Sequence, residues 1–566
     1  MHEAFYMARR TCLINYTKEY IKKPKDLLTS DSFSTFLDTF LTRMIDEYPE
    51  IYAWLKMDLS YDQLKEEIVK ILKLLTILEL DEIDHPYLGN IEYLKLVIEI
   101  GYNFWREQQR YSYIYTRNDS GLQLVNFLEA DEAFNRLILT FYRDIEEKVQ
   151  GYTNNVYRQL RAGTDASFVL LDYQWNVPGE YSDLIGIPFV NKMMLRTPLI
   201  LHPASNKRSN VFVETEKNPM HDFNKGNDEW LCYPCKVGTL IFQCYFHRDF
   251  TSGMIAMSNL FQLATDEEIM NNKPDCIMLF GVKDNTKDTI YYHDEKNSIW
   301  VGKVSDHDAI EYFGYVKKMM LTLYNLACME KGWLPIHGAM INLYLKDGTK
   351  KGIVLMGDSG AGKSETIEAM TGISKGEIIR EEIIFDDMGS FHIDENGEVV
   401  AQGSEIGAFV RLDDLDKGTA YKDLDRSIFF NPEASNSRVV IPASTHETII
   451  KNHHVDMFLY ANNYTDKRGV RMVETLEEAK PIFVEGKRFA LGTTQEKGLS
   501  TTFFANPFGP MQEQDLCNPI IDEVFEALFK NNIPIGEIFT CLGLPDKGND
   551  GIVDSAKVLL GIIKEL

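Results

Sequence analysis

The spacing of apolar positions changes along the chain and divides it into regions. In residues 61–80, apolar side chains recur at steps of three and four residues, at Leu64, Ile68, Ile71, Leu75 and Leu78. This spacing is typical of one apolar face of an α-helix. A second stretch repeats it with Phe134, Leu137, Phe141 and Ile145. Residues 1–165 are therefore predicted to form an all-helical accessory or oligomerisation domain, open to a protein partner or self-association.

Short runs rich in β-branched and aromatic residues replace this pattern from about residue 166. Turn signals separate them, and each has the length of a strand: SFVLLDY, TPLILHP, SNVFVET, GTLIFQCYF, CIMLFGV and TIYYHD. From about residue 331, strands alternate with helices to the C-terminus. We expect a mixed α/β (α+β) protein in three parts, 1–165, 166–330 and 331–566.

Composition narrows the classes of partner. The 566 residues carry 59 Lys and Arg against 85 Asp and Glu, a net charge of −26. This charge argues against nucleic acid or an anionic membrane surface as the main partner. No apolar run approaches the roughly 18–20 residues that span a bilayer, and the first residues lack a secretion signal. We expect a cytoplasmic protein.

One cysteine pattern has the spacing of a zinc site. Cys232 and Cys235 are followed by Cys244 and His247, and such spacing suits zinc. However, IFQCYFH is predicted to be a strand, on which residues three apart point to opposite faces. Buried thiols are the preferred interpretation, and zinc the alternative.

The segment KKGIVLMGDSGAGKSETIEAM has the pattern G-x-x-x-x-G-K-S between an apolar strand and a helix. In this context the glycines let backbone N–H groups converge on phosphate oxygens at the start of a helix. Lys363 would contact the outer phosphates, and the Ser364 hydroxyl would bind the metal that bridges them. The predicted phosphate-binding residues are Gly357, Asp358, Ser359, Gly360, Ala361, Gly362, Lys363 and Ser364.

Two adjacent carboxylates follow the next strand. In EEIIFDDMGSF, Asp386 and Asp387 end an apolar run, where carboxylates are costly unless they bind metal or substrate. Metal binding is the preferred use, and a solvated turn is the alternative.

Upstream of the loop, Lys317 and Lys318 are predicted to precede a helix, and His337 lies on a strand leading toward the loop. Taken alone, the lysines suit a solvated helix face and the histidine suits a buried core position. Together with the loop and the aspartates, these segments resemble the phosphoenolpyruvate carboxykinases, whose lysine pair, histidine, phosphate loop and aspartate pair occur in this order. ASNSRVVIPAS (434–444) and LGTTQEKGLSTTFFANPFGPM (491–511) are similar to two further segments of that family.

The resemblance implies a two-lobed catalytic core in which residues 166–330 form the substrate lobe and residues 331–566 the nucleotide-binding lobe. Lys318, His337 and Asp387 would bind Mn²⁺, with Lys317 helping to keep the Lys318 amine neutral. Lys363 and Ser364 would hold the phosphates of ATP and a Mg²⁺ ion. Arg438 would stabilise the phosphoryl group in transfer, and Tyr312 would face the small-acid pocket.

Two assignments stay open within the resemblance. The substrate-binding arginine is either Arg196 or Arg208. The stretch 543–560 is similar to the family's base-binding segment without its usual arginine, so GTP and pyrophosphate are alternative donors to ATP. The loop itself, with Asp358, resembles that of the bacterial HPr kinase/phosphorylase, a relative with the same nucleotide core.

The leading hypothesis is a lyase that interconverts oxaloacetate and a phosphoryl donor with phosphoenolpyruvate and CO₂. The second is a kinase that phosphorylates a hydroxyl on a protein or small molecule, with Asp387 acting on the acceptor's proton. The third is a nucleotide sensor with little turnover, whose N-terminal region binds a partner.

Overall fold

The structure is a computed structural model that describes all residues except 1–2, 117–120, 159, 174–176, 209–211, 227–229, 359, 375, 416–420, 492–496 and 545–549. The chain divides into two compact units. Unit 1 comprises Met1–Gln174, Gly186–Leu199 and Lys225–Leu231, and unit 2 comprises Trp175–Ile185, Ile200–Asn224 and Cys232–Leu566. Helices and several sheets make the protein mixed α/β, as predicted. The boundaries near residues 165 and 330 stay predictions.

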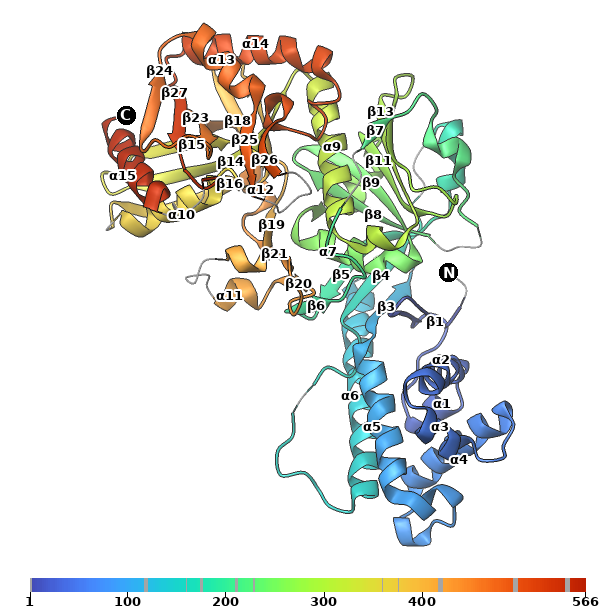
Figure 1. Ribbon diagram of the computed structural model, residues 1–566. Helices are drawn as coiled ribbons and strands as arrows, with labels where there is room; N and C mark the ends of the chain where they lie inside the picture. The colour runs from blue at the N-terminus through green and yellow to red at the C-terminus, as the bar shows by residue number, and fades with distance from the viewer. Residues whose placement is uncertain are drawn as a thin grey trace. The chain divides into compact units, whose positions relative to one another are not determined.

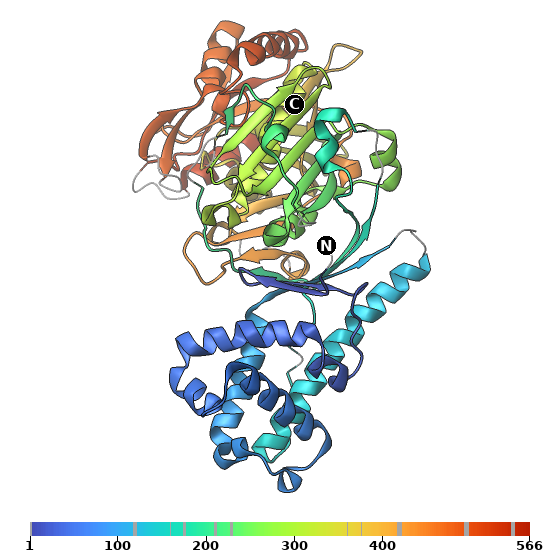
Figure 2. The same ribbon diagram turned by 90° about the vertical axis from the view of Figure 1, so that its right-hand side faces the viewer.

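Unit 1 combines a group of helices with five strands (Figure 1). Its helices are α1 (Pro24–Leu28), α2 (Asp31–Glu47), α3 (Pro49–Lys56), α4 (Tyr61–Ile77), α5 (Ile91–Glu107) and α6 (Gly121–Gln150). Its strands, in sheet order, are β1 (Phe5–Ala8), β2 (Thr11–Asn15), β3 (Gln109–Tyr115), β4 (Ala166–Leu171) and β5 (Phe189–Leu195). Figure 2 shows the helices, blue to cyan, gathered into one bundle.

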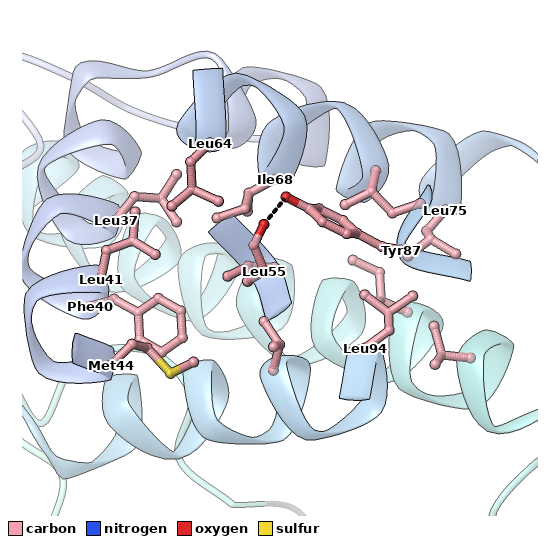
Figure 3. Packing of buried hydrophobic residues seen from close by; sticks show 14 of the residues in the cluster. Leu37, Phe40, Leu41, Met44, Leu55, Leu64, Ile68, Leu75, Tyr87 and Leu94 are labelled. Carbon is pink, nitrogen blue, oxygen red and sulfur yellow. Dashed lines mark hydrogen bonds between the residues drawn. The ribbon is translucent and has the colours of Figure 1, made fainter. Parts of the chain in front are cut away.

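The predicted apolar face of α4 is confirmed. Leu64, Ile68, Ile71 and Leu75 are all buried, and they pack with residues of α2, α3 and α5 in one apolar core (Figure 3). The helix begins where a capping box allows it, because the Ser60 side chain accepts from the backbone N–H of Gln63 and the Gln63 side chain accepts from that of Ser60. Apolar spacing and a local cap therefore specify this helix together.

The prediction that residues 1–165 are all helical is wrong, because β1, β2 and β3 lie within them. All five residues of β2 are buried. A strand covered on both faces shows no alternation of apolar and polar residues, so periodicity does not reveal it. β3 begins two residues after α5 ends, which left no turn signal between the two elements.

Unit 2 contains a first sheet with the strand order β8-β9-β11-β13-β12-β7, and β10 pairs with β8. Helix α9 packs on β11 and β13 and also contacts β14 and β17 of a second sheet. The elements of this part are β6 (Leu199–Leu201), β7 (Val213–Glu214), β8 (Trp230–Val237), β9 (Leu240–His247), α7 (Thr251–Ala256), β10 (Gln262–Leu263), α8 (Asp266–Asn271), β11 (Cys276–Val282), β12 (Thr289–Asp294), β13 (Ile299–Ser305) and α9 (Gly314–Glu330).

The second sheet has the order β22-β18-β17-β14-β15-β23-β27-β24, with β16 also paired to β14. Its elements include β14 (Leu334–Leu345), β15 (Lys350–Met356), α10 (Lys363–Ile373), β16 (Ile378–Phe385), β17 (Met388–Ile393), β18 (Val399–Gly403), β22 (His453–His454), β23 (Met457–Asn462), β24 (Val470–Val473), α13 (Leu476–Glu485), α14 (Gln514–Lys530), β27 (Ile535–Phe539) and α15 (Asp550–Glu565). Smaller elements complete the unit: β19 (Gly407–Arg411), α11 (Tyr421–Leu424), β20 (Ile428–Phe430), β21 (Arg438–Pro442), α12 (His446–Ile449), β25 (Lys487–Leu491) and β26 (Lys497–Thr501).

Helices cover both faces of this second sheet (Figure 1). On β23, Leu459 packs in a core with α10 and α15. The preceding residue, Phe458, instead contacts the rings of Phe483 on α13 and Phe525 on α14. Successive strand residues point to opposite faces, so this alternation places one helix pair on each side. The sheet is thereby a rigid support for the loops at its edge.

Two further expectations concern membranes and cysteines. Within the part of the chain that the structure describes, no helix has both the length and the apolar character needed to cross a bilayer. The segment IFQCYFH is a strand, β9, as predicted. All eight cysteines are buried thiols outside any disulfide, and burial raises the pKa of Cys244 well above its usual value. The predicted burial of the thiols is confirmed.

Candidate functional site

The phosphate loop connects β15 to α10 in the strand–loop–helix order that the sequence predicted. Gly360 and Gly362 have positive φ angles of 79° and 93°, which favour glycine. A Cβ atom on Gly362 would lie 2.8 Å from the Cβ of Thr540. Helix α10 begins at Lys363, whose Nζ donates to the carbonyl oxygen of Gly357 at 2.6 Å. The loop thus curls around a lysine amine. Ser359 lies outside the described residues.

Next to the loop, Ser364 meets the first carboxylate of the aspartate pair. The Ser364 hydroxyl donates to Oδ1 of Asp386 at 2.9 Å. Burial raises the pKa of Asp386, and repulsion from Asp387 adds to this effect. A hydroxyl and a carboxylate at the start of a phosphate-binding helix are the oxygen ligands that Mg²⁺ prefers beside a nucleotide.

The structure brings Lys318, His337 and Asp387 together. The Nζ of Lys318 lies 2.6 Å from Oδ2 of Asp387, and Nε2 of His337 lies 3.1 Å from Oδ1 of Asp387. Lys317 joins them, with its Nζ 2.8 Å from Oδ2 of Asp387. The three predicted segments therefore supply an amine, an imidazole and a carboxylate to one point.

Strand pairing explains how His337 reaches Asp387. The long strand β14 pairs first with β17, where His337 faces Met388, and then with β16, where Met340 faces Phe385. The bend between β16 and β17 therefore lies beside His337, and the backbone N–H of Gly338 donates to the Asp387 carbonyl oxygen at 3.1 Å. A Cβ on Gly338 would lie 2.6 Å from a carbonyl oxygen of β15, so this position requires glycine.

The prediction that Lys317 and Lys318 precede a helix is wrong, because both residues lie in the first turns of α9. The helix starts at Gly314 after Phe313, which provides no side-chain cap. The usual sequence signal for a helix start was therefore missing. Both lysines consequently have fixed positions on a helix that packs against two sheets.

Burial and neighbouring charges shift the pKa values of the two lysines in opposite directions. Burial lowers the pKa of Lys318, the charge of Asp387 opposes this, and the charge of Lys317 adds to it. For Lys317, burial also disfavours the charged form, but Asp387 and Glu405 outweigh it and raise its pKa. Burial likewise opposes ionisation of Asp387, yet Lys317 and Lys318 hold its pKa well below the usual range. Lys318 is thus the amine that is more easily neutral.

Glu405 is a site residue that the sequence analysis missed. Its Oε1 lies 3.1 Å from Nζ of Lys317, and burial raises its pKa to about 7 although Lys317 opposes the shift. The available signal was a charged residue two positions after the fully buried strand β18. Lys317 therefore bridges the buried carboxyl group of Glu405 and the partly buried one of Asp387.

Hydrogen bonding also orients the imidazole. Nδ1 of His337 lies 2.7 Å from the carbonyl oxygen of Ala505. A carbonyl only accepts, so Nδ1 carries hydrogen and donates. In the neutral ring, Nε2 is then the nitrogen that keeps the lone pair, and it lies 3.1 Å from Oδ1 of Asp387, as expected of a histidine oriented to bind a metal through Nε2.

The donor set fits a divalent metal by spacing and chemistry. Adjacent ligands of an octahedral ion with bonds of about 2.1 Å lie about 3 Å apart. The separations from Asp387 to Lys318 and His337 are 2.6 and 3.1 Å. Within the described ranges, no three His, Cys, Asp or Glu residues form a metal-binding group. The expected site therefore depends on the amine of Lys318.

One of the two candidate arginines lies at this cluster. The guanidinium of Arg208 is 5.4 Å from the ring centre of Phe508, and Nζ of Lys318 is 4.5 Å from the same centre. Burial lowers the pKa of Arg208. Arg196 instead belongs to unit 1, where it pairs with the buried carboxylate of Asp131. Arg208 is the arginine that the structure brings to the site.

Arg438 and Tyr312 lie near the cluster because both contact the ring of Phe409, which Lys317 also contacts. The guanidinium of Arg438 and the Nζ of Lys317 each lie 5.7 Å from the ring centre of Phe409. The ring of Tyr312 lies 6.1 Å from it. Among the described contacts, neither Arg438 nor Tyr312 pairs with Asp387. Both residues therefore lie around the cluster, beside Phe409, without binding its carboxylate.

Asp358, the residue that makes the loop similar to that of the HPr kinase, has a structural partner. Its Oδ2 lies 3.0 Å from Nε of Arg488, and both side chains are almost fully buried. Oδ1 lies 3.8 Å from Nδ1 of His337. The aspartate therefore links the loop to the strand that follows α13. Residues 545–549 of the expected base-binding stretch lie outside the described residues.

Comparison with known proteins adds no assignment to this geometry. No model of a known protein family matches the sequence, and no curated protein matches it. The function is therefore inferred from the site.

Proposed function

We propose that this protein is a phosphoenolpyruvate carboxykinase-type lyase with a phosphate-loop lobe, acting in the cytoplasm. It would interconvert oxaloacetate and a phosphoryl donor with phosphoenolpyruvate and CO₂. The observation that carries the proposal is that Nζ of Lys318 and Nε2 of His337 lie 2.6 and 3.1 Å from the two carboxylate oxygens of Asp387. A simple nucleotide-binding loop does not need this cluster.

The two predicted metals have separate residues in this proposal. Lys318, His337 and Asp387 would hold Mn²⁺, and Ser364 with Asp386 would hold Mg²⁺ beside the donor phosphates. When bound, the Mn²⁺ ion would supply a positive charge that stabilises the enolate formed on loss of CO₂. Lys363 would release the loop carbonyls that it contacts now and donate to the outer phosphates.

Other side chains would bind and orient the small acid. Arg208 and Arg438 are planar donors suited to carboxylate and phosphoryl oxygens. Tyr312 lies near the same cluster. Lys317, fixed between Asp387 and Glu405, would keep the Lys318 amine neutral by electrostatic repulsion and hold the Asp387 carboxylate in place. The ring of Phe508 would exclude water from one side of the cluster.

The test is an assay of phosphoenolpyruvate formation from oxaloacetate with Mn²⁺ and Mg²⁺, run separately with ATP, GTP and pyrophosphate. We expect one donor to support turnover, with CO₂ released in equal amount. Donor consumption without any carbon product would instead identify the kinase, with Asp387 acting on the acceptor. Nucleotide binding without phosphate transfer would identify the sensor.

Substitutions then locate the activity. Lys318→Met and Asp387→Asn should each lower kcat by about 10³-fold, the scale of losing a group that stabilises transition-state charge. Lys451→Met is the matched control, because this lysine is exposed and pairs only with the neighbouring Glu447 in the part of the chain described. Full activity of Lys318→Met would contradict the proposed metal site.

A further inference from the structure

Unit 1 contains an apolar cavity of about 170 Å³. It lies among α2, α3, α4, α5 and α6, and its lining includes Phe40, Leu55, Ile68, Leu94 and Ile145. Figure 3 shows Leu55, Ile68 and Leu94 turned toward one another from three different helices. Close-packed interiors contain few voids larger than a water molecule. This cavity is therefore a feature of the fold that packing alone does not explain.

Its size and lining match those of a ligand site. A cavity of about 150 Å³ lined by Leu, Ile and Phe stays dry and binds benzene. The cavity of unit 1 is slightly larger and has a mostly apolar lining of the same kind; unlike that enclosed cavity it opens partly to solvent, which gives a ligand a way in. Water is a poor occupant, because a buried water needs two to four polar partners.

Two hydroxyls on the cavity wall, those of Tyr16 and Tyr102, have no hydrogen-bond partner among the described residues. The Tyr16 hydroxyl lies near the side chain of Ser112, so that of Tyr102 is the more isolated of the two. The residue Tyr102 on α5 is only 9% exposed, lines the cavity, and has a hydroxyl without a hydrogen-bond partner among the described residues. Its ring stacks on that of Tyr142, at 3.6 Å between centres. The Tyr142 hydroxyl, by contrast, donates to Oε1 of Glu99 at 2.6 Å.

An unpaired buried hydroxyl is unfavourable, since folding removes its bonds to water. A guest with one oxygen or nitrogen would restore the missing bond to Tyr102. A tyrosine hydroxyl can both donate and accept, so either kind of polar group on the ligand would pair with it. The wall thus combines a large apolar surface with an isolated hydroxyl that can anchor a ligand.

We propose that unit 1 binds a small apolar molecule, of the size of a substituted benzene, that carries a single hydrogen-bonding group paired with the Tyr102 hydroxyl. This site uses only residues of unit 1 and does not depend on the chemistry proposed for unit 2. It gives the N-terminal region a ligand-binding role in addition to the packing of its helices.

The test uses phenol and toluene as probes, because they differ mainly in a hydroxyl against a methyl group. Binding to the full chain is measured by calorimetry and by the rise in the thermal unfolding midpoint. We expect both probes to bind saturably. Tyr102→Phe should weaken phenol by about three- to tenfold, the value of one hydrogen bond, and leave toluene unchanged within twofold.

A cavity-filling variant provides the second arm. Val97 lines the cavity, and Val97→Phe should abolish the binding of both probes. If circular dichroism shows that this variant does not fold, the comparison of phenol with toluene binding to Tyr102→Phe still tests the proposal. The proposal fails if neither probe binds the wild-type chain, if Tyr102→Phe affects both probes equally, or if a folded Val97→Phe binds them as before.

Discussion

The core of unit 1 and the site of unit 2 are both largely shielded from water, but they are built from opposite kinds of residue. The core of unit 1 is formed by aliphatic and aromatic side chains from α2 to α6. The site of unit 2 places two lysines, a histidine and two carboxyl groups within about 3 Å of their partners, with Lys317, His337 and Glu405 buried and Lys318 and Asp387 partly buried. One region is stabilised by removing apolar surface from water, whereas the other holds charges that are costly to bury.

The difference shows what each region is free to do. Apolar packing tolerates a void and any guest of similar polarity, but it provides no reactive group. The charged cluster is stable only while each charge keeps its partner, and this condition fixes the positions of Lys318, His337 and Asp387 before any metal binds. Preorganisation of this kind is what charge-stabilising catalysis requires.

Removing one charge from the unit 2 cluster should have the largest effect on stability. Lys317→Met keeps the length of the side chain but leaves the carboxyl groups of Asp387 and Glu405 without their shared cation. Breaking a buried ion pair in this way costs about 3 to 5 kcal/mol of unfolding free energy. Urea denaturation followed by circular dichroism measures the loss.

The loss should depend on pH in a defined direction. Glu405 already has a pKa raised to about 7 by burial although Lys317 opposes the shift, so without Lys317 this carboxyl group would bind a proton still more readily when folded than when unfolded. The variant should therefore recover stability from pH 8 to pH 5.5. Lys451→Met, at an exposed position, should stay within about 0.5 kcal/mol at both pH values. A loss that does not change with pH would show that the cluster is not held together by charge.

Truncating the unit 1 core should have a somewhat smaller effect of a different kind. Leu64 is fully buried, and Leu64→Ala should cost about 3 kcal/mol through lost apolar contacts and the cavity left behind. The loss should be equal at pH 8 and pH 5.5, and kcat per folded molecule should not change. Ile77→Ala in the same helix is the control, because Ile77 is 77% exposed. A change in kcat for Leu64→Ala would mean that the two regions are coupled.

The same contrast explains which features the sequence could predict. The phosphate loop, the α4 face and the strand position of His337 depend on residues close together in the chain, and each has a local signal. The start of α9 has none, because Phe313 provides no cap. The strand β2 is buried on both faces and so lacks alternation. Both errors arise where tertiary burial, rather than local sequence, determines the element.

Long-range pairings could not be predicted in the same way. Lys317 meets Glu405, and Arg208 meets Phe508, only after several strands have been placed. The choice between Arg196 and Arg208 was open for this reason. Only the observed pairing of Arg196 with Asp131 in unit 1 separates them. The sequence indicates what chemistry each of these side chains can perform, but it does not indicate which residue each side chain contacts.

The smallest expected effect concerns a titratable group inside unit 1. His85 is buried, its Nδ1 accepts from the backbone N–H of Tyr87 at 3.3 Å, and its Nε2 lies 2.9 Å from Oε2 of Glu67. Nδ1 can accept only while it is unprotonated, so this arrangement requires the neutral ring. Burial lowers the pKa of His85, although Glu67 opposes the shift.

The sign of the pH effect follows from this shift. Because the folded pKa lies below the unfolded value of 6.5, the unfolded chain binds the proton first as the pH falls. The contribution of His85 is therefore complete above pH 6.5 and is lost toward pH 5.5, with a slope of at most about 1.4 kcal/mol per pH unit for one proton. His85→Gln should remove this part of the pH dependence, whereas His454→Gln, at a half-exposed position, should not. If His85→Gln left the pH dependence of unfolding free energy unchanged, the His85 ring would have the same pKa in the folded and unfolded chain. The neutral ring would then contribute nothing to the stability of unit 1.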